Sequence, residues 1–160
     1  MKNLYYLLFL FVILSCSNEN QNRKLILNEN DSLVFIRFNS KGQYIYPFYK
    51  LTKSEVFRDD TYFTYINQLE YYYNEDTASL VNLGLDKFNH TKDLINYFPN
   101  KLLSTERKIG NPGALDGGVL YLQLTKNGVT KIWELDSDPN AVPEVFRVFV
   151  QKINEKINKL

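Results

Sequence analysis

The chain has 160 residues, with 19 lysine and arginine, 18 aspartate and glutamate, 44% hydrophobic and 15% aromatic residues. This length predicts one domain, and a domain of about 145 residues buries roughly 68–70% of its unfolded surface without help from disulfides or metals. The aromatic content and balanced charge argue against disorder. The sequence has one cysteine and one histidine. This scarcity excludes a zinc finger, a disulfide scaffold, an iron–sulfur cluster and any metal site that needs two His or Cys ligands, so we expect no cofactor.

Residues 1–15 have the pattern of a secretory signal peptide. Lys2 supplies the positive charge, and an uninterrupted apolar run follows from Leu4 to Leu14. Eleven residues rise only about 16 Å as a helix, which is roughly half of the ~30 Å hydrocarbon core of a bilayer. A cleaved signal segment therefore fits the run better than a stable transmembrane helix.

The apolar run ends in Ile13-Leu14-Ser15-Cys16, which resembles the bacterial lipobox recognised by the type II signal peptidase. In that family the cysteine is lipidated and becomes the first residue of the mature chain. The alternative is an ordinary signal peptide with an incidental cysteine, but a free thiol is hard to explain in an exported protein. The resemblance implies a lipoprotein that is exported and held to the bacterial membrane by lipid, such as palmitate, on Cys16, facing the periplasm or the cell surface.

The mature chain is expected to have no net charge. Removing residues 1–15 removes Lys2 and no acidic residue, which leaves 18 positive and 18 negative side chains. No basic excess remains to bind nucleic acid by counterion release, so we expect no nucleic-acid partner, and membrane attachment should come from the lipid. Residues 16–24 are then the lipidated cysteine with a polar tether, and residues 25–160 form a single globular domain.

The first half of the domain predicts strands. Leu33–Phe38 is rich in β-branched and aromatic residues, which predicts a strand. Asn39–Gly42 is a predicted turn, and Gln43–Tyr46 is a second predicted strand that runs back beside the first. Because Pro47 cannot donate to a β-ladder, the second strand should be an edge strand or bend there. Residues 54–88 are ambiguous between helix and strand, and we favour a strand over Tyr62–Ile66.

A short helix is predicted from Thr91, as N-cap, to Phe98, with Pro99 as the stop. Leu94, Ile95 and Phe98 would be its buried side. His90 then lies in the loop at the helix start. No serine elbow or orienting acid is evident near this histidine, so a surface or capping role is favoured over a general base.

Asn127-Gly128 predicts a type I′ hairpin turn. The register then pairs Lys126 with Val129, Leu124 with Lys131, Leu122 with Trp133 and Leu120 with Leu135. Directly paired residues share a face, so one face of the hairpin is apolar except for Lys131. The other face should carry Tyr121, Gln123, Thr125, Thr130, Ile132 and Glu134.

A C-terminal amphipathic helix is predicted to begin at Pro139 or Pro143. Its apolar side chains fall within a stripe about 100° wide, and these are Val142, Phe146, Phe149, Val150, Ile153, Ile157 and Leu160. Lys152, Lys156 and Lys159 lie toward its C-terminal end, where the helix dipole favours cations.

Three segments are candidate functional sites. The Gly110–Gly118 loop holds four of the seven glycines, and Asp116 before Gly117 and Gly118 is its best polar anchor, although an ordered loop without binding function is the simpler interpretation. Tyr71, Tyr72 and Tyr73 offer flat amphipathic area suited to a glycan or a partner protein, or else pack in a core. Asp136–Asn140 opens like a calcium loop but lacks the required Gly and Glu, so it predicts a turn.

The ending from Asp116 to Leu160 is similar to that of small uncharacterised α+β bacterial lipoproteins. We expect an α+β fold with an antiparallel sheet of about four or five strands and two or three helices packed on one face. The best-supported function is a non-enzymatic, lipid-anchored accessory or binding module whose partner is an envelope protein or glycan. The alternatives are a carboxylate-dependent hydrolase of cell-wall or glycan material and a purely structural envelope lipoprotein.

Overall fold

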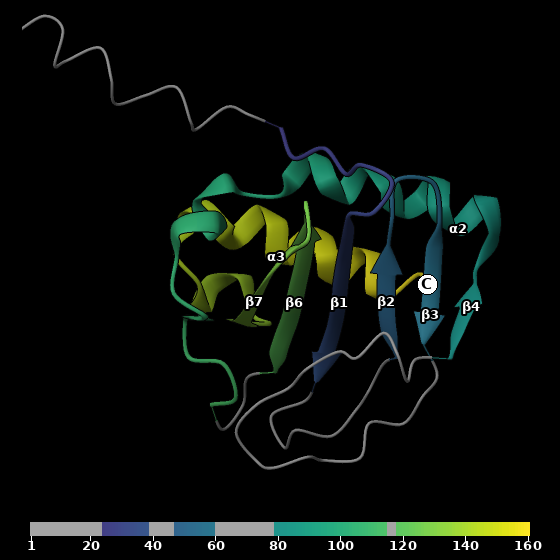
Figure 1. Cartoon of the computed structure of the whole chain (residues 1–160). Coiled ribbons are helices and arrows are strands. Elements are labelled where there is room, and N and C mark those ends of the chain that lie inside the picture. Colours follow the sequence, from purple (N-terminus) through teal and green to yellow (C-terminus); the bar gives the residue numbers. More distant parts are fainter. Residues whose placement is uncertain (1–23, 39–46, 60–78, 115–117) are drawn as a thin grey trace, which may run out of the picture.

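The computed structural model of the chain describes residues 24–38, 47–59, 79–114 and 118–160. The fold is α+β, with a single sheet covered on one face by a helical layer (Figure 1). The strands are β1 (Ser32–Phe38), β2 (Phe48–Leu51), β3 (Val56–Asp59), β4 (Leu80–Asn82), β5 (Lys108–Ile109), β6 (Val119–Lys126) and β7 (Val129–Asp136). The helices are α2 (Gly84–Thr91) and α3 (Glu144–Ile157), with 3₁₀ turns η2 (Lys92–Tyr97), η3 (Asn100–Ser104) and η4 (Pro139–Ala141).

Within the described ranges the sheet has seven strands, in the order β4-β3-β2-β1-β6-β7-β5. The prediction of four or five strands was therefore too low. The prediction of an antiparallel sheet holds for the other pairs, but the sheet is mixed because β5 runs parallel to β7. The strands β3, β4 and β5 have only four, three and two residues, which is too short to leave a recognisable alternation in the sequence.

The strand that follows Pro47 is not at an edge, because β2 pairs with β1 on one side and with β3 on the other. Pro47 precedes the first paired residue and so interrupts no ladder bond. The predicted turn at 39–42 and the predicted strands at 43–46 and 62–66 lie outside the described residues.

The β6–β7 hairpin is confirmed in every pair of the predicted register. Asn127 and Gly128 have φ angles of 51° and 75°, the left-handed conformation that a type I′ turn requires at both central residues. Lys131 on the apolar face is exposed and donates to the backbone carbonyl of Leu103, with 2.6 Å between Nζ and O, and Lys126, paired with Val129, lies on the same face nearer the turn.

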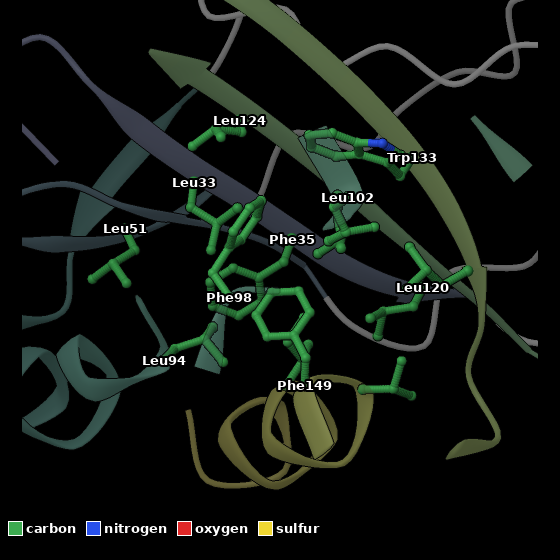
Figure 2. Close-up of a cluster of buried hydrophobic side chains, with 14 of the residues drawn as sticks. Leu33, Phe35, Leu51, Leu94, Phe98, Leu102, Leu120, Leu124, Trp133 and Phe149 are labelled. Carbon is green, nitrogen blue, oxygen red and sulfur yellow. The ribbon is translucent and has the colours of Figure 1, made fainter. Parts of the chain in front are cut away.

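The main core lies between the sheet and the helical layer (Figure 2). Phe98, which follows η2, packs edge-on against Trp133 of β7 and Phe149 of α3, with ring centroids 6.1 and 5.4 Å apart. Phe98 thus links the segment after η2 to the sheet and to α3. The predicted apolar stripe of α3 is confirmed, since six of its members are buried and Leu160 packs partly buried against them.

The opposite face of the sheet carries a second buried cluster, made of Val34, Ile36, Phe38, Phe48, Val119 and Tyr121. On the hairpin face that was predicted to carry mixed polar residues, Tyr121, Gln123 and Glu134 are buried, whereas Thr130 next to the turn is exposed. Burial on both faces explains why β1 reads as a continuous apolar run rather than an alternation.

The helix predicted over Thr91–Phe98 begins earlier than expected. α2 starts at Gly84, whose backbone N–H is accepted by the Asn82 side chain at 2.8 Å. Thr91 occupies the N-cap position of η2, as predicted, but its side chain makes no capping hydrogen bond, because its hydroxyl donates to the carbonyl of Lys87 one turn back. The 3₁₀ turn η2 covers the rest, and the helical path ends before Pro99 as predicted.

Candidate functional site

The β6 strand connects two ends of the molecule. At the proximal end, defined by Ile26, Asp31, Lys126 and Val129, the start of the described chain meets the β6–β7 turn. At the distal end, defined by Gly110, Gly118 and Ser137, the glycine-rich loop meets the end of β7. An eight-residue strand separates the two ends by about 23 Å, and Figure 1 shows the β6 arrow pointing toward the end where the purple segment joins the sheet.

Asp31 fastens the chain start to the hairpin at the proximal end. Its carboxylate is buried and accepts the backbone N–H of Asn28 at 2.9 Å and of Asn127 at 2.8 Å. Lys126 completes the arrangement, with Nζ 3.3 Å from Asp31 Oδ2 and 2.6 Å from the carbonyl of Ile26. These backbone hydrogen bonds, helped by Lys126, lower the pKa of Asp31 from its ordinary value of 3.8.

The described glycines of the Gly110–Gly118 loop have structural reasons to be glycine. A Cβ on Gly110, whose φ is +79°, would lie 2.7 Å from the Ala141 carbonyl oxygen. A Cβ on Gly118 would lie 2.5 Å from the Phe38 carbonyl oxygen and 2.6 Å from Ser137 Oγ. These close approaches favour the interpretation as an ordered loop that holds β1, β6 and the end of β7 together.

The Asp136–Asn140 segment is a turn, as predicted. The Asp136 carboxylate accepts the backbone N–H of Asp138, and the Asp138 carboxylate accepts that of Asn140, both at 2.9 Å. The side chains therefore cap the local backbone. Within the described ranges, no group of three or more His, Cys, Asp or Glu side chains is arranged to hold a metal ion.

The structure describes one of the predicted site residues, Gly118. Cys16, Tyr71, Tyr72, Tyr73, Asp116 and Gly117 lie outside the described residues. Among the predicted site residues, Gly118 alone is therefore placed in the described part of the chain.

His90 is not in a loop at a helix start but in the last turn of α2. The loop prediction was wrong because the helix α2 precedes η2 directly and runs through His90 to Thr91. The buried ring atom Nε2 has no hydrogen-bond partner in the described part of the chain. Burial lowers the pKa of His90 from its ordinary value of 6.5, and the neighbouring cations Lys156 and Lys159 lower it further.

Sequence reasoning missed a polar group on the second face of the sheet. Tyr121 donates its hydroxyl to Gln123 Oε1 at 2.7 Å, and both side chains are buried. On the neighbouring strand Glu134 accepts Arg107, with Nε and Nη2 at 3.1 and 2.9 Å from Oε1. This ion pair fastens the chain beside β5 to β7, and no spacing in the sequence links residues 27 positions apart.

Sequence reasoning also missed the exposed apolar side chains of the proximal end. Ile26 is 66% exposed, Val129 61% and Leu103 36%. Lys126, which pairs with Val129 across the hairpin, donates to the Ile26 carbonyl. Lys131, two residues after Val129, donates to the Leu103 carbonyl, so two lysines of the hairpin reach the backbone of Ile26 and of Leu103. Within the described residues, no helix is long and apolar enough to cross a membrane.

No family model, no curated protein and no solved structure matches this chain.

Proposed function

We propose that this protein is a lipid-anchored accessory module of the bacterial cell envelope, held to its membrane through Cys16. The observation that carries the proposal is the Ile13-Leu14-Ser15-Cys16 motif directly after a charged residue and an eleven-residue apolar run. Because Cys16 is the chain's single cysteine, lipidation accounts for it fully. More than one acyl chain on this residue gives stable attachment, since each buried methylene contributes about 0.8 kcal/mol.

The arrangement of the two ends supports a role in binding. Cys16 precedes the proximal end in the chain, whereas Gly118, the last residue of the candidate loop, lies at the distal end. An anchor at one end leaves the other free to meet a partner away from the membrane. The binding surface that we propose contains Asp116 and Gly117 of this loop together with Tyr71, Tyr72 and Tyr73, and its ligand is an envelope protein or glycan.

Metabolic labelling with palmitate in a bacterial host tests the anchor. The wild-type chain should incorporate label and remain with membranes, whereas Cys16→Ala should incorporate none and leave the membrane fraction. Asn18→Ala, two residues further along, is the matched control and should label as the wild type does. An unlabelled wild-type protein would refute the anchor.

Site-specific photo-crosslinking in intact envelopes tests the binding surface. A crosslinking residue at the exposed Asn111, in the distal loop, should give an adduct that disappears when Asp116→Ala is added. The exposed Val145 of α3 serves as the control position. The same adducts at both positions, unchanged by Asp116→Ala, would contradict a binding role for the loop.

A further inference from the structure

We propose that the proximal end of the domain docks directly on the lipid bilayer, with Ile26, Leu103 and Val129 inserted at the interface beside the anchor. The proposal rests on lipidation of Cys16 and adds an orientation to it. The domain stands with its proximal end in the membrane surface and its distal loop facing away from the lipid.

Ile26 and Val129 are two of the most exposed large apolar side chains in the described ranges, at 66% and 61%. Both residues lie at the same end of the hairpin, because Lys126 pairs with Val129 while its ammonium lies 2.6 Å from the Ile26 carbonyl oxygen. Leu103 joins them through Lys131, whose ammonium lies 2.6 Å from the Leu103 carbonyl oxygen. Apolar side chains gathered at one turn are costly in water and gain free energy on entering lipid.

The apolar surface is also rigidly presented. Leu25 and Leu27, on either side of Ile26, are buried in the main core and leave Ile26 pointing outward. Asp31 ties this segment to the backbone of Asn127 in the turn. Little conformational freedom is therefore lost when the surface enters the lipid interface.

The length of chain between the anchor and the domain identifies the occupant as lipid. Lys24 is eight residues from Cys16, and eight residues span at most about 29 Å even when fully extended. The proximal end is thereby kept close to the bilayer at high effective concentration. The ammonium groups of Lys24 and Lys131 lie on or beside this segment and turn, where anionic headgroups attract them.

A fluorescent label at single positions tests the docking. Once Cys16 is lipidated the chain holds no other thiol, so Val129→Cys and Val145→Cys each accept one environment-sensitive fluorophore. Val145 is the matched control, a valine of similar exposure (55%) in the first turn of α3. The full-length lipidated protein is reconstituted into phosphatidylethanolamine–phosphatidylglycerol vesicles, with and without nitroxide-labelled lipid.

We expect the label at position 129 to shift to shorter wavelength and to be quenched by nitroxide lipid several-fold more strongly than the label at position 145. Adding Ile26→Asp should reduce this quenching while the protein still floats with the vesicles. Since Ile26 and Val129 are exposed, the fold should survive both changes, which the fluorescence of the buried Trp133 checks.

Two results overturn the proposal and separate it from the anchor. If the protein floats with vesicles but both labels are quenched equally, the docking is wrong and the lipid anchor stands. If the wild-type protein does not float, the anchor itself is wrong and the docking falls with it.

Discussion

The ammonium group of Lys156 in α3 donates a hydrogen bond to the backbone carbonyl of His90 in α2, with 2.5 Å between Nζ and O. The same group lies 2.6 Å from Asp93 Oδ1, and Lys156 is only 8% exposed. In return, Lys87 of α2 donates to the carbonyl of Lys159, just past the end of α3. Each helix thus satisfies a carbonyl at the C-terminal end of the other, where backbone acceptors lack partners within the helix.

Replacing Lys156 should weaken this junction. Lys156→Met keeps much of the side-chain volume but leaves the His90 carbonyl and the Asp93 carboxylate without their donor, so we expect a loss of about 1–3 kcal/mol in the free energy of unfolding. Urea unfolding followed by Trp133 fluorescence measures it. Lys159→Met, at an exposed position, is the control and should change stability little; equal effects of the two variants would contradict the role given to Lys156.

The stability of the protein should depend on pH through His90. Its folded-state pKa is lowered because burial and the positive charges of Lys156, Lys159 and Lys87 disfavour the imidazolium, against a smaller opposing effect of Asp93. The unfolded chain therefore binds the proton more readily. The neutral ring contributes fully to the free energy of unfolding above pH 6.5, which is the ordinary pKa of histidine. This contribution is lost as the pH falls from there through the folded-state pKa.

Urea unfolding across this pH range tests the effect of His90. The wild type should lose stability on acidification, and His90→Gln should lose less over the same interval. Parallel curves for the two proteins would contradict the account.

Asp31 should be the strongest single polar contributor at the proximal end. Asp31→Ala leaves the N–H groups of Asn28 and Asn127 without their charged acceptor, and hydrogen bonds to charged groups contribute about 1.5–3 kcal/mol each. Chemical denaturation should show a loss at least as large as one such bond contributes, with Glu29→Ala, an exposed neighbour paired with Lys53, nearly neutral. Because the folded-state pKa of Asp31 is lowered, its contribution is present above pH 3.8 and is lost as the pH falls through the folded value.

Gly118→Ala should destabilise the domain whether or not a ligand binds the loop. The added methyl would meet the Phe38 carbonyl oxygen and Ser137 Oγ at distances that force the backbone to shift, and overpacking of this kind costs about 1–3 kcal/mol. Thermal unfolding of the purified variant checks this, with Asn111→Ala at an exposed position of the same loop as control. An unchanged melting temperature for Gly118→Ala would show that the close approach does not constrain this position.

Short sequence patterns predicted the elements whose structure depends on residues close together in the chain. The β6–β7 register follows from Asn127-Gly128, and the buried stripe of α3 follows from its spacing. The sequence could not predict the parallel pairing of β5, since two residues carry no periodicity. Nor could it predict the reciprocal lysines, because Lys156 and His90 are 66 positions apart.

Functional residues could be predicted only where they are adjacent in the sequence. The lipobox residues are contiguous, so Cys16 could be proposed from the sequence alone. The proximal apolar surface joins residues 26, 103 and 129, and only the packing of the chain start against the hairpin brings them together.

Intact-mass spectrometry of the protein isolated from bacterial membranes is the most direct test of the central claim. We expect a chain that begins at Cys16 and whose mass exceeds that of residues 16–160 by a glyceride-linked lipid. Cys16→Ala should lack this added mass. A wild-type chain that retains residues 1–15, or that begins after residue 16 without lipid, would contradict the anchor and with it the proposed function.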